Sequence, residues 1–318
     1  DSRIDASGEA GGSVILWGDT ALFAAGEITT RGAGRNGGFI ETSGGYVSNA
    51  ASLDPGRGGQ WLLDPVDVLI TLDSDNVAWG GPGGTTVRPD APPADEPAEV
   101  NATLINFLLD GGADVTVLTE SLNPEAPVQQ GNITVAAPIT KTEGDEATLT
   151  LDADWNIIIN EDILGVGGQP LNINLFAANN VQINNNLNSN GGLVDILAAG
   201  GNIAATAGTT ITSDRLRMEA LSGIGSSGAA TPIGTSVSVL EAYTKVGGIY
   251  VRNTGRWLTI GPAVPGSDMG VESEFGGNVE LINDSGITIS GGEHGAYAYG
   301  DALIKAEGYN EVYGETGS

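Results

Sequence analysis

Short runs of alternating apolar and polar residues recur along the chain, separated by Gly, Asn and Asp. Period-two alternation places successive side chains on opposite faces of a strand. Gly, Asn and Asp tolerate the backbone conformations that tight turns require. The strands predicted in the first block, residues 1–72, are Arg3–Ala6, Ser13–Trp17, Ala21–Ala24, Phe39–Thr42, Tyr46–Asn49, Gln60–Leu63 and Val66–Thr71.

The segment GGQWLLDPVDVLIT, residues 58–71, shows the repeating unit most clearly. An apolar strand breaks at Asp64-Pro65 and resumes at Val66, and Pro is expected at a corner because it cannot donate to a sheet ladder. Related units begin at Gly11 and Gly37, so the starts lie 26 and 21 residues apart. Repetition at this period is typical of solenoid folds.

Residues 73–147 interrupt the pattern and are predicted to be an insertion with a loop, a short helix and strands. The first part, residues 73–98, is rich in Pro, Gly and Asp and reads as a projecting loop. A helix is expected near Ala98–Asp110, ended by Gly111-Gly112. Its predicted apolar face, which we expect to pack against the main body, consists of Val100, Leu104, Phe107 and Leu108.

A second periodic block, residues 148–318, continues the same rod. Similar segments begin at positions 149, 171, 193, 216 and 237, about 22 residues apart, and weaker copies begin at 279 and 301. An antiparallel sandwich also has many short strands but requires no fixed period. We therefore predict an all-β fold, a right-handed parallel β-helix (β-solenoid) of roughly ten to twelve coils, with an extra-helical insertion that contains a short α-helix. The Asn residues expected to form ladders at its corners are Asn172, Asn174, Asn184, Asn185 and Asn186.

The composition restricts the function classes. A net charge of −28 disfavours nucleic acid and anionic lipid partners. The absence of Cys excludes disulfides and thiolate chemistry. No apolar run approaches the roughly 18 residues that span a bilayer, so no membrane insertion is expected. The acidic surface leaves Ca²⁺ as the one cofactor considered, and no metal site is assigned.

The candidate catalytic chemistry is sparse. His294 is the only His, and we expect it in a surface loop. The best carboxylate pairs involve Asp73, Asp75, Asp152, Asp154 and Asp162, for which solvated corners are the favoured interpretation over metal ligands. We assign no catalytic residue and expect no enzyme. The alternative is a carbohydrate-active β-helix enzyme, a polysaccharide lyase or hydrolase, that uses such Asp clusters.

The tryptophans separate into two groups. Trp61, Trp155 and Trp257 lie in strand-like runs and are predicted to pack in the core or between coils, whereas Trp79 lies in the Gly/Pro-rich loop. A binding site on the insertion loop would use Trp79 with its charged neighbours. The residues assigned to it are Trp79, Asp73, Asp75 and Arg88.

Several segments resemble a known family. GGFIETSGG (37–45) followed by GGQWLLDPVDVLIT (58–71), TLINFLLDGGADVTVLT (103–119) and GNITVAAPITKTEGDEATLTLDADWNIIIN (131–160) resemble the filamentous haemagglutinin-like adhesins. These are large exoproteins of Gram-negative two-partner secretion systems. The resemblance covers roughly residues 11–160. Beyond it, GGIYVRNTGRWLTIG (247–261) is similar to the family's loosely repeated coils.

The resemblance implies export through an outer-membrane partner transporter and a place at, or release from, the bacterial cell surface. It implies a shaft that mediates attachment to host cells, other bacteria or biofilm matrix, with a receptor or carbohydrate as partner, a role in virulence and no catalysis. The N-terminal secretion domain of such proteins is not evident. We therefore expect a monomeric shaft portion of a longer exoprotein.

Overall fold

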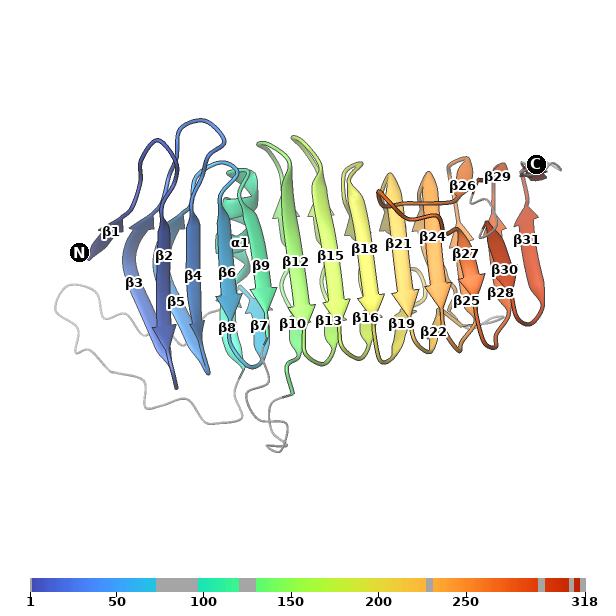
Figure 1. Cartoon of the computed structure of the whole chain (residues 1–318), viewed down its shortest axis with the longest axis horizontal. Helices are drawn as coiled ribbons and strands as arrows, with labels where there is room; N and C mark the ends of the chain where they lie inside the picture. Colours follow the sequence, from blue (N-terminus) through green and yellow to red (C-terminus); the bar gives the residue numbers. More distant parts are fainter. Residues whose placement is uncertain are drawn as a thin grey trace.

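The protein forms a rod of stacked β-coils (Figure 1). The computed structural model describes residues 2–72, 97–119, 130–226, 231–290 and 295–308, and the backbone of 312–314. It is nearly all β, with about 11 parallel coils and a single short helix in the described part of the chain. The predicted fold class, a parallel β-solenoid with one short α-helix, is confirmed.

The strands lie in three sheets. Sheet A contains β1 (Arg3–Asp5), β3 (Leu22–Thr29) and β5 (Val47–Asp54). Sheet B contains β2 (Ser13–Gly18), β4 (Phe39–Gly44), β6 (Gln60–Asp64), β9 (Asp114–Leu118), β12 (Ala147–Ala153), β15 (Leu171–Ala177), β18 (Leu193–Ala198), β21 (Arg215–Ala220), β24 (Val239–Thr244), β26 (Leu258–Ile260), β27 (Val271–Ser273), β29 (Ile287–Ile289), β30 (Ala296–Ala298) and β32 (Val312–Gly314).

Sheet C contains two rows of strands that merge at β25. The row that continues β7 (Val68–Thr71), which also pairs with β8 (Ala98–Asn101), is β10 (Ile133–Val135), β13 (Ile157–Ile159), β16 (Val181–Ile183), β19 (Asn202–Ala205) and β22 (Gly223–Ile224). The second row is β11 (Ile139–Lys141), β14 (Ile163–Gly165), β17 (Leu187–Asn188), β20 (Ile211–Thr212) and β23 (Ile233–Ser236). Both rows pair with β25 (Ile249–Asn253), which β28 (Val279–Asn283) and β31 (Ala302–Ala306) follow.

The core follows from the alternation of side chains along each strand. In β15 the inward residues Leu171, Ile173 and Leu175 are fully buried, while the outward residues Asn174 and Phe176 are partly exposed. Each inward residue stacks on its equivalent in the adjacent coils, since Ile173 lies opposite both Leu149 and Val194. The apolar interior is therefore continuous from coil to coil, and stacking buries it.

The corners are held by polar contacts between successive coils. Pro65 lies between β6 and β7, as predicted. The amide nitrogen of Asn156 donates to the side chain of Asn132 at 3.1 Å, and its oxygen accepts from that of Asn180 at 3.2 Å. Asn184 and Asn186 continue such ladders by donating to Asn160 and Asp162, respectively. Other expected members have different partners: Asn172 donates to Glu146, Asn174 to Thr150, and Asn185 to the Asn160 carbonyl.

The helix is shorter than predicted. Residues 98–101 form β8 because their backbone pairs with β7, and α1 (Ala102–Asp110) follows. Asn101 caps the helix by accepting from the Thr103 amide at 2.7 Å. The predicted apolar face is wrong in part, because Phe107 is exposed and Val100 lies in a strand. The residues that the helix buries are Ala102, Ile105, Leu108 and Leu109.

Strands within the predicted insertion 73–147 take part in the long sheets. β9 pairs with β6 and β12, and β10 pairs with β7 and β13. Helix α1 thus connects β8 in sheet C to β9 in sheet B and lies beside the rod (Figure 1). Residues 73–96 of the expected loop lie outside the described residues.

Candidate functional site

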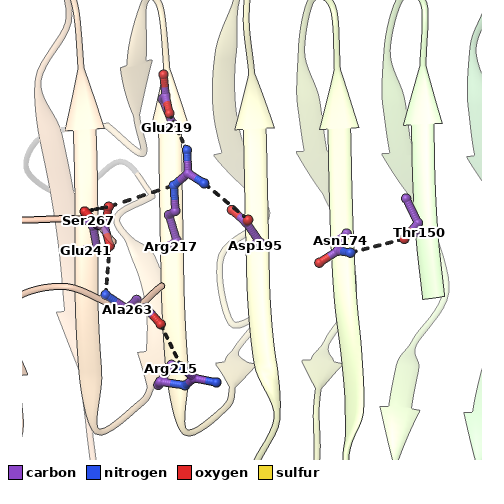
Figure 2. Close-up of polar contacts among 9 residues, drawn as sticks. All are labelled: Thr150, Asn174, Asp195, Arg215, Arg217, Glu219, Glu241, Ala263 and Ser267. Atoms are coloured by element: carbon purple, nitrogen blue, oxygen red, sulfur yellow. Dashed lines mark hydrogen bonds and ion pairs between the residues drawn. The ribbon is translucent and has the colours of Figure 1, made fainter. Parts of the chain in front are cut away.

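A column of polar side chains crosses the outer face of sheet B (Figure 2). The parallel register places Asn174, Asp195, Arg217 and Glu241 opposite one another on β15, β18, β21 and β24. Thr150 on β12 extends the column and accepts from Asn174 at 3.1 Å. The residues alternate with buried core residues such as Ile196, so they face away from the apolar interior.

Arg217 lies between three carboxylates in this column. Its guanidinium contacts Asp195 at 3.4 Å and Glu219 at 2.7 Å, and its Nε lies 3.9 Å from Glu241. Glu241 is 4% exposed and Asp195 is 9% exposed. Buried charges are stable when they are paired and hydrogen-bonded, and one guanidinium supplies that pairing here.

Residues 261–270 leave the sheet beside Glu241. The strand β24 pairs with β26 through Leu240 and with β27 through Ala242, so the intervening segment crosses the outer face. Glu241 fastens it, because its carboxylate accepts from the Ala263 amide at 2.8 Å and from the Ser267 hydroxyl at 2.7 Å. Arg215 donates to the Ala263 carbonyl at 3.1 Å (Figure 2). We refer to residues 261–270 as the roof segment.

A cavity of about 250 Å³ lies beneath the roof segment. Arg217, Glu241, Tyr243 and Met269 are among the residues that line it. The Tyr243 hydroxyl donates to Glu274, which with partial burial and nearby carboxylates raises the pKa of Tyr243 to about 12. Tyr243 is therefore a neutral hydrogen-bond donor at neutral pH.

In the column, burial and the opposite charge of a neighbour shift the pKa of a side chain in opposite directions. Burial raises the pKa of Asp195, and Arg217 partly offsets this rise. For Arg217, burial lowers the pKa, but the bond to Glu219 and the surrounding carboxylates outweigh burial and leave the pKa raised. The arrangement can hold the roof segment against the rod and can offer carboxylate and guanidinium groups to a polar ligand.

Trp79, Asp73, Asp75 and Arg88 all lie outside the described residues, as does His294. Among the described residues, no group of three or more Asp, Glu or His side chains could hold a metal ion. No helix in the described part of the chain is long and apolar enough to cross a membrane.

The remaining candidates have defined places. Trp61 is fully buried, as predicted, and donates to Thr42 at 3.1 Å. Trp155 is 40% exposed and is therefore not a core residue. Trp257 is 45% exposed, but its ring lies against Gly286 of the next coil, so it packs between coils. Asp162 belongs to a corner ladder, where it accepts from the Asn186 amide at 2.9 Å.

Comparison with protein-family models gives one finding that bears on activity. Residues 96–155 match the retroviral aspartyl protease family, a segment well short of half of the chain. This match contradicts our prediction that the protein is not an enzyme, and that prediction is withdrawn. A search of curated proteins finds no match to the chain.

The carboxylates of the matched segment differ in their surroundings. Asp110 accepts from the Thr142 amide at 2.6 Å and the Glu143 amide at 3.1 Å. Burial raises the pKa of Asp152, and the neighbouring charge of Asp154 raises it further. Aspartic proteases use two carboxylates that share one proton. In the described part of the segment, two pairs of carboxylates influence each other's charge: Asp154 raises the pKa of Asp152, and Glu146 raises that of Asp114. Asp152 and Asp154 are the pair in which both partners are Asp.

Proposed function

We propose that the chain is a shaft portion of a secreted or surface-displayed bacterial adhesin that attaches to host cells, other bacteria or biofilm matrix. The observation that carries the proposal is the continuous stack of parallel coils. Each coil extends the rod by about 4.8 Å, so about 11 coils give a length of roughly 50 Å. A rod of this kind holds binding surfaces away from the surface that anchors it.

The composition supports export by a two-partner route. The chain has no Cys, so no disulfide forms before or during passage through an outer-membrane transporter. Coils that contact only their neighbours can fold by sequential stacking. The family resemblance of the segments in residues 11–160 supports the same route and a location at the Gram-negative cell surface.

Bead attachment tests the adhesive function. Beads coated with the folded protein should bind at least one of three surfaces, namely epithelial cells, Gram-negative bacteria and isolated biofilm matrix. Beads coated with an unrelated globular protein of similar net charge control for electrostatic adsorption. Attachment no greater than that of the control on all three surfaces would refute the adhesive function.

A second candidate function, peptide hydrolysis, rests on the match to the aspartyl protease family. If it holds, the purified protein should cleave an unfolded protein substrate between about pH 3 and 7, the range in which carboxyl pairs share a proton. Asp152→Asn should abolish cleavage, whereas Asp268→Asn, an exposed substitution in the roof segment, should not. No cleavage, or equal cleavage by both variants, would exclude the Asp152–Asp154 pair as the catalytic centre.

A further inference from the structure

A second cavity lies where helix α1 meets two corners of the N-terminal coils. Its volume is about 290 Å³. The chain segments that line it are residues 31–34, residues 54–57 and the end of α1 with Gly111 and Ala113. Gly34, one of these residues, has a φ of +66°, a backbone conformation that favours glycine. The cavity lies in a different part of the rod from the roof segment.

Three guanidinium groups gather at this cavity and its margin. Arg31 and Arg57 line it, and Arg31 is paired with Asp54. Arg57 shares Asp145 with Arg35, whose guanidinium lies 3.1 Å from that carboxylate. Direct ion pairs therefore join these three guanidinium groups to two carboxylates, Asp54 and Asp145. The charges of Glu27 and Asp5 also act on Arg31. The chain has a net charge of −28 and only 12 Lys and Arg residues, so three guanidinium groups at one site are a concentration of its few cations.

Phe107 gives the cavity an aromatic wall. Its side chain lines the cavity and is 59% exposed, on the side of α1 away from the buried residues Ile105 and Leu109. An exposed aromatic ring can cover the apolar face of a flat ligand. The cavity thus offers an apolar face and cationic groups together.

We propose that this cavity binds an acidic sugar unit, a pyranose that carries one carboxylate. Arg31 and Arg57 bind the carboxylate, since guanidinium groups match carboxylates in planar, charge-assisted hydrogen bonds. Phe107 covers one face of the sugar ring. The volume, near the lower end of the range for ligand pockets, suits one or two sugar units. The net charge of the rod disfavours polyanions such as nucleic acids.

Asp54 and Asp145 compete with the ligand for these guanidinium groups. The pairs also link successive corners of the rod, so loss of an Arg alone does not separate a binding role from a structural one. Removal of the competing carboxylate does. Asp145→Asn frees Arg35 and Arg57 and should strengthen binding, whereas a purely structural network predicts no gain in affinity.

The experiment is a titration of the folded protein with methyl glucuronide, monitored by ligand-observed NMR, with methyl glucoside as the neutral control. Phe107→Ala and the double variant R31Q/R57Q should each weaken binding about 10-fold or more, as loss of one charge-assisted bond or a stacking contact predicts. Asp145→Asn should strengthen it about threefold. Circular dichroism and thermal unfolding verify that each variant is folded.

Equal binding of the charged and neutral sugars would overturn the proposal, as would glucuronide binding that none of the substitutions changes. Absence of glucuronide binding by the wild-type protein would also overturn it. The proposal deepens the attachment function by naming a ligand class and rests on that function for its biological role. Bead attachment without glucuronide binding would remove the sugar site alone, and the reverse result would remove the adhesive function alone.

Discussion

The regular coils between β12 and β21 and the interrupted coil after β24 solve the same packing problem in different ways. In the regular coils each outer residue faces an equivalent on both neighbouring strands, as Asn174 faces Thr150 and Asp195. After β24 the next strand is divided into β26 and β27, and neither of these strands has a residue opposite Glu241. The Glu241 carboxylate binds the roof segment there instead.

This difference teaches that the interior and the exterior of the rod are specified separately. The inward residues Leu240 and Ala242 on either side of Glu241 remain fully buried and keep their strand partners. An insertion of ten residues, 261–270, is therefore accommodated without loss of the core register. Both cavities described above occur where the chain leaves the regular repeat, beneath the roof segment and beside α1.

The largest expected effect comes from the interior of a regular coil. Leu175 is fully buried and lies between Leu151 and Ile196 of the adjacent coils. Leu175→Ala should therefore lower the free energy of unfolding by about 2–5 kcal/mol. Phe176→Ala on the outer face of the same strand is the matched control and should cost about 1 kcal/mol or less. Chemical denaturation measures both. Equal costs would contradict the separation of interior from exterior.

The next prediction concerns the contacts by which Glu241 holds the roof segment in the interrupted coil. Glu241→Ala removes the acceptor for Ala263 and Ser267 and leaves buried donors unpaired, which should cost about 1–3 kcal/mol. Hydrogen exchange should show faster exchange of the Ala263 amide in the variant. Glu280→Ala, on the outer face of β28 in a neighbouring coil, is the control. Unchanged protection of Ala263 would show that the carboxylate does not hold the segment.

The corner ladders should contribute less to the free energy of unfolding than the apolar core. The Asn156 side chain donates to Asn132 and accepts from Asn179 and Asn180. Its replacement by Ala breaks these contacts at half-exposed sites, for which we expect a cost of about 1–2 kcal/mol. Gln169→Ala, at an exposed corner, should be close to neutral. A fall in the thermal midpoint that is equal in the two variants would argue against stabilising ladders.

The fold could be predicted from sequence because inward positions repeat with a strong chemical signal. Alternating Val, Ile and Leu separated by Gly and Asn corners indicated stacked coils, and Pro65 lies at the corner where it was expected. The helix start was misplaced by four residues because Ala98–Asn101 has no local feature that excludes helix. Pairing with β7, a non-local contact, makes this segment a strand.

The outer column was missed because sequence copies were aligned at Leu193 and Leu216. The structure places Leu216 opposite Val194, one residue away. A shift of one residue exchanges the two faces of a strand, so the alignment concealed that Asp195, Arg217 and Glu241 lie side by side. Opposite charges at equivalent outward positions were the available signal. The roof segment could not be foreseen, since no local pattern marks where a repeat is interrupted.

The smallest expected effect contrasts two carboxylates of the outer face. Burial raises the pKa of both Asp195 and Asp152, but Arg217 partly offsets the rise for Asp195, whereas the charge of Asp154 adds to the rise for Asp152. A carboxyl whose pKa is raised by folding is most favourable when protonated, so the ionised Asp152 destabilises the folded state above that pKa.

Asp152→Asn should therefore increase the free energy of unfolding at pH 7, by no more than about 0.5 kcal/mol. The gain should vanish as the pH falls below about 3.8, the ordinary pKa of an Asp side chain. The wild-type carboxyl is then protonated in both the folded and the unfolded protein. Denaturant unfolding at pH 7 and pH 3, with the exposed substitution Asp268→Asn as a charge-matched control, measures this change. A gain that persists at pH 3, or one that Asp268→Asn reproduces, would mean that the raised pKa of Asp152 does not cause it.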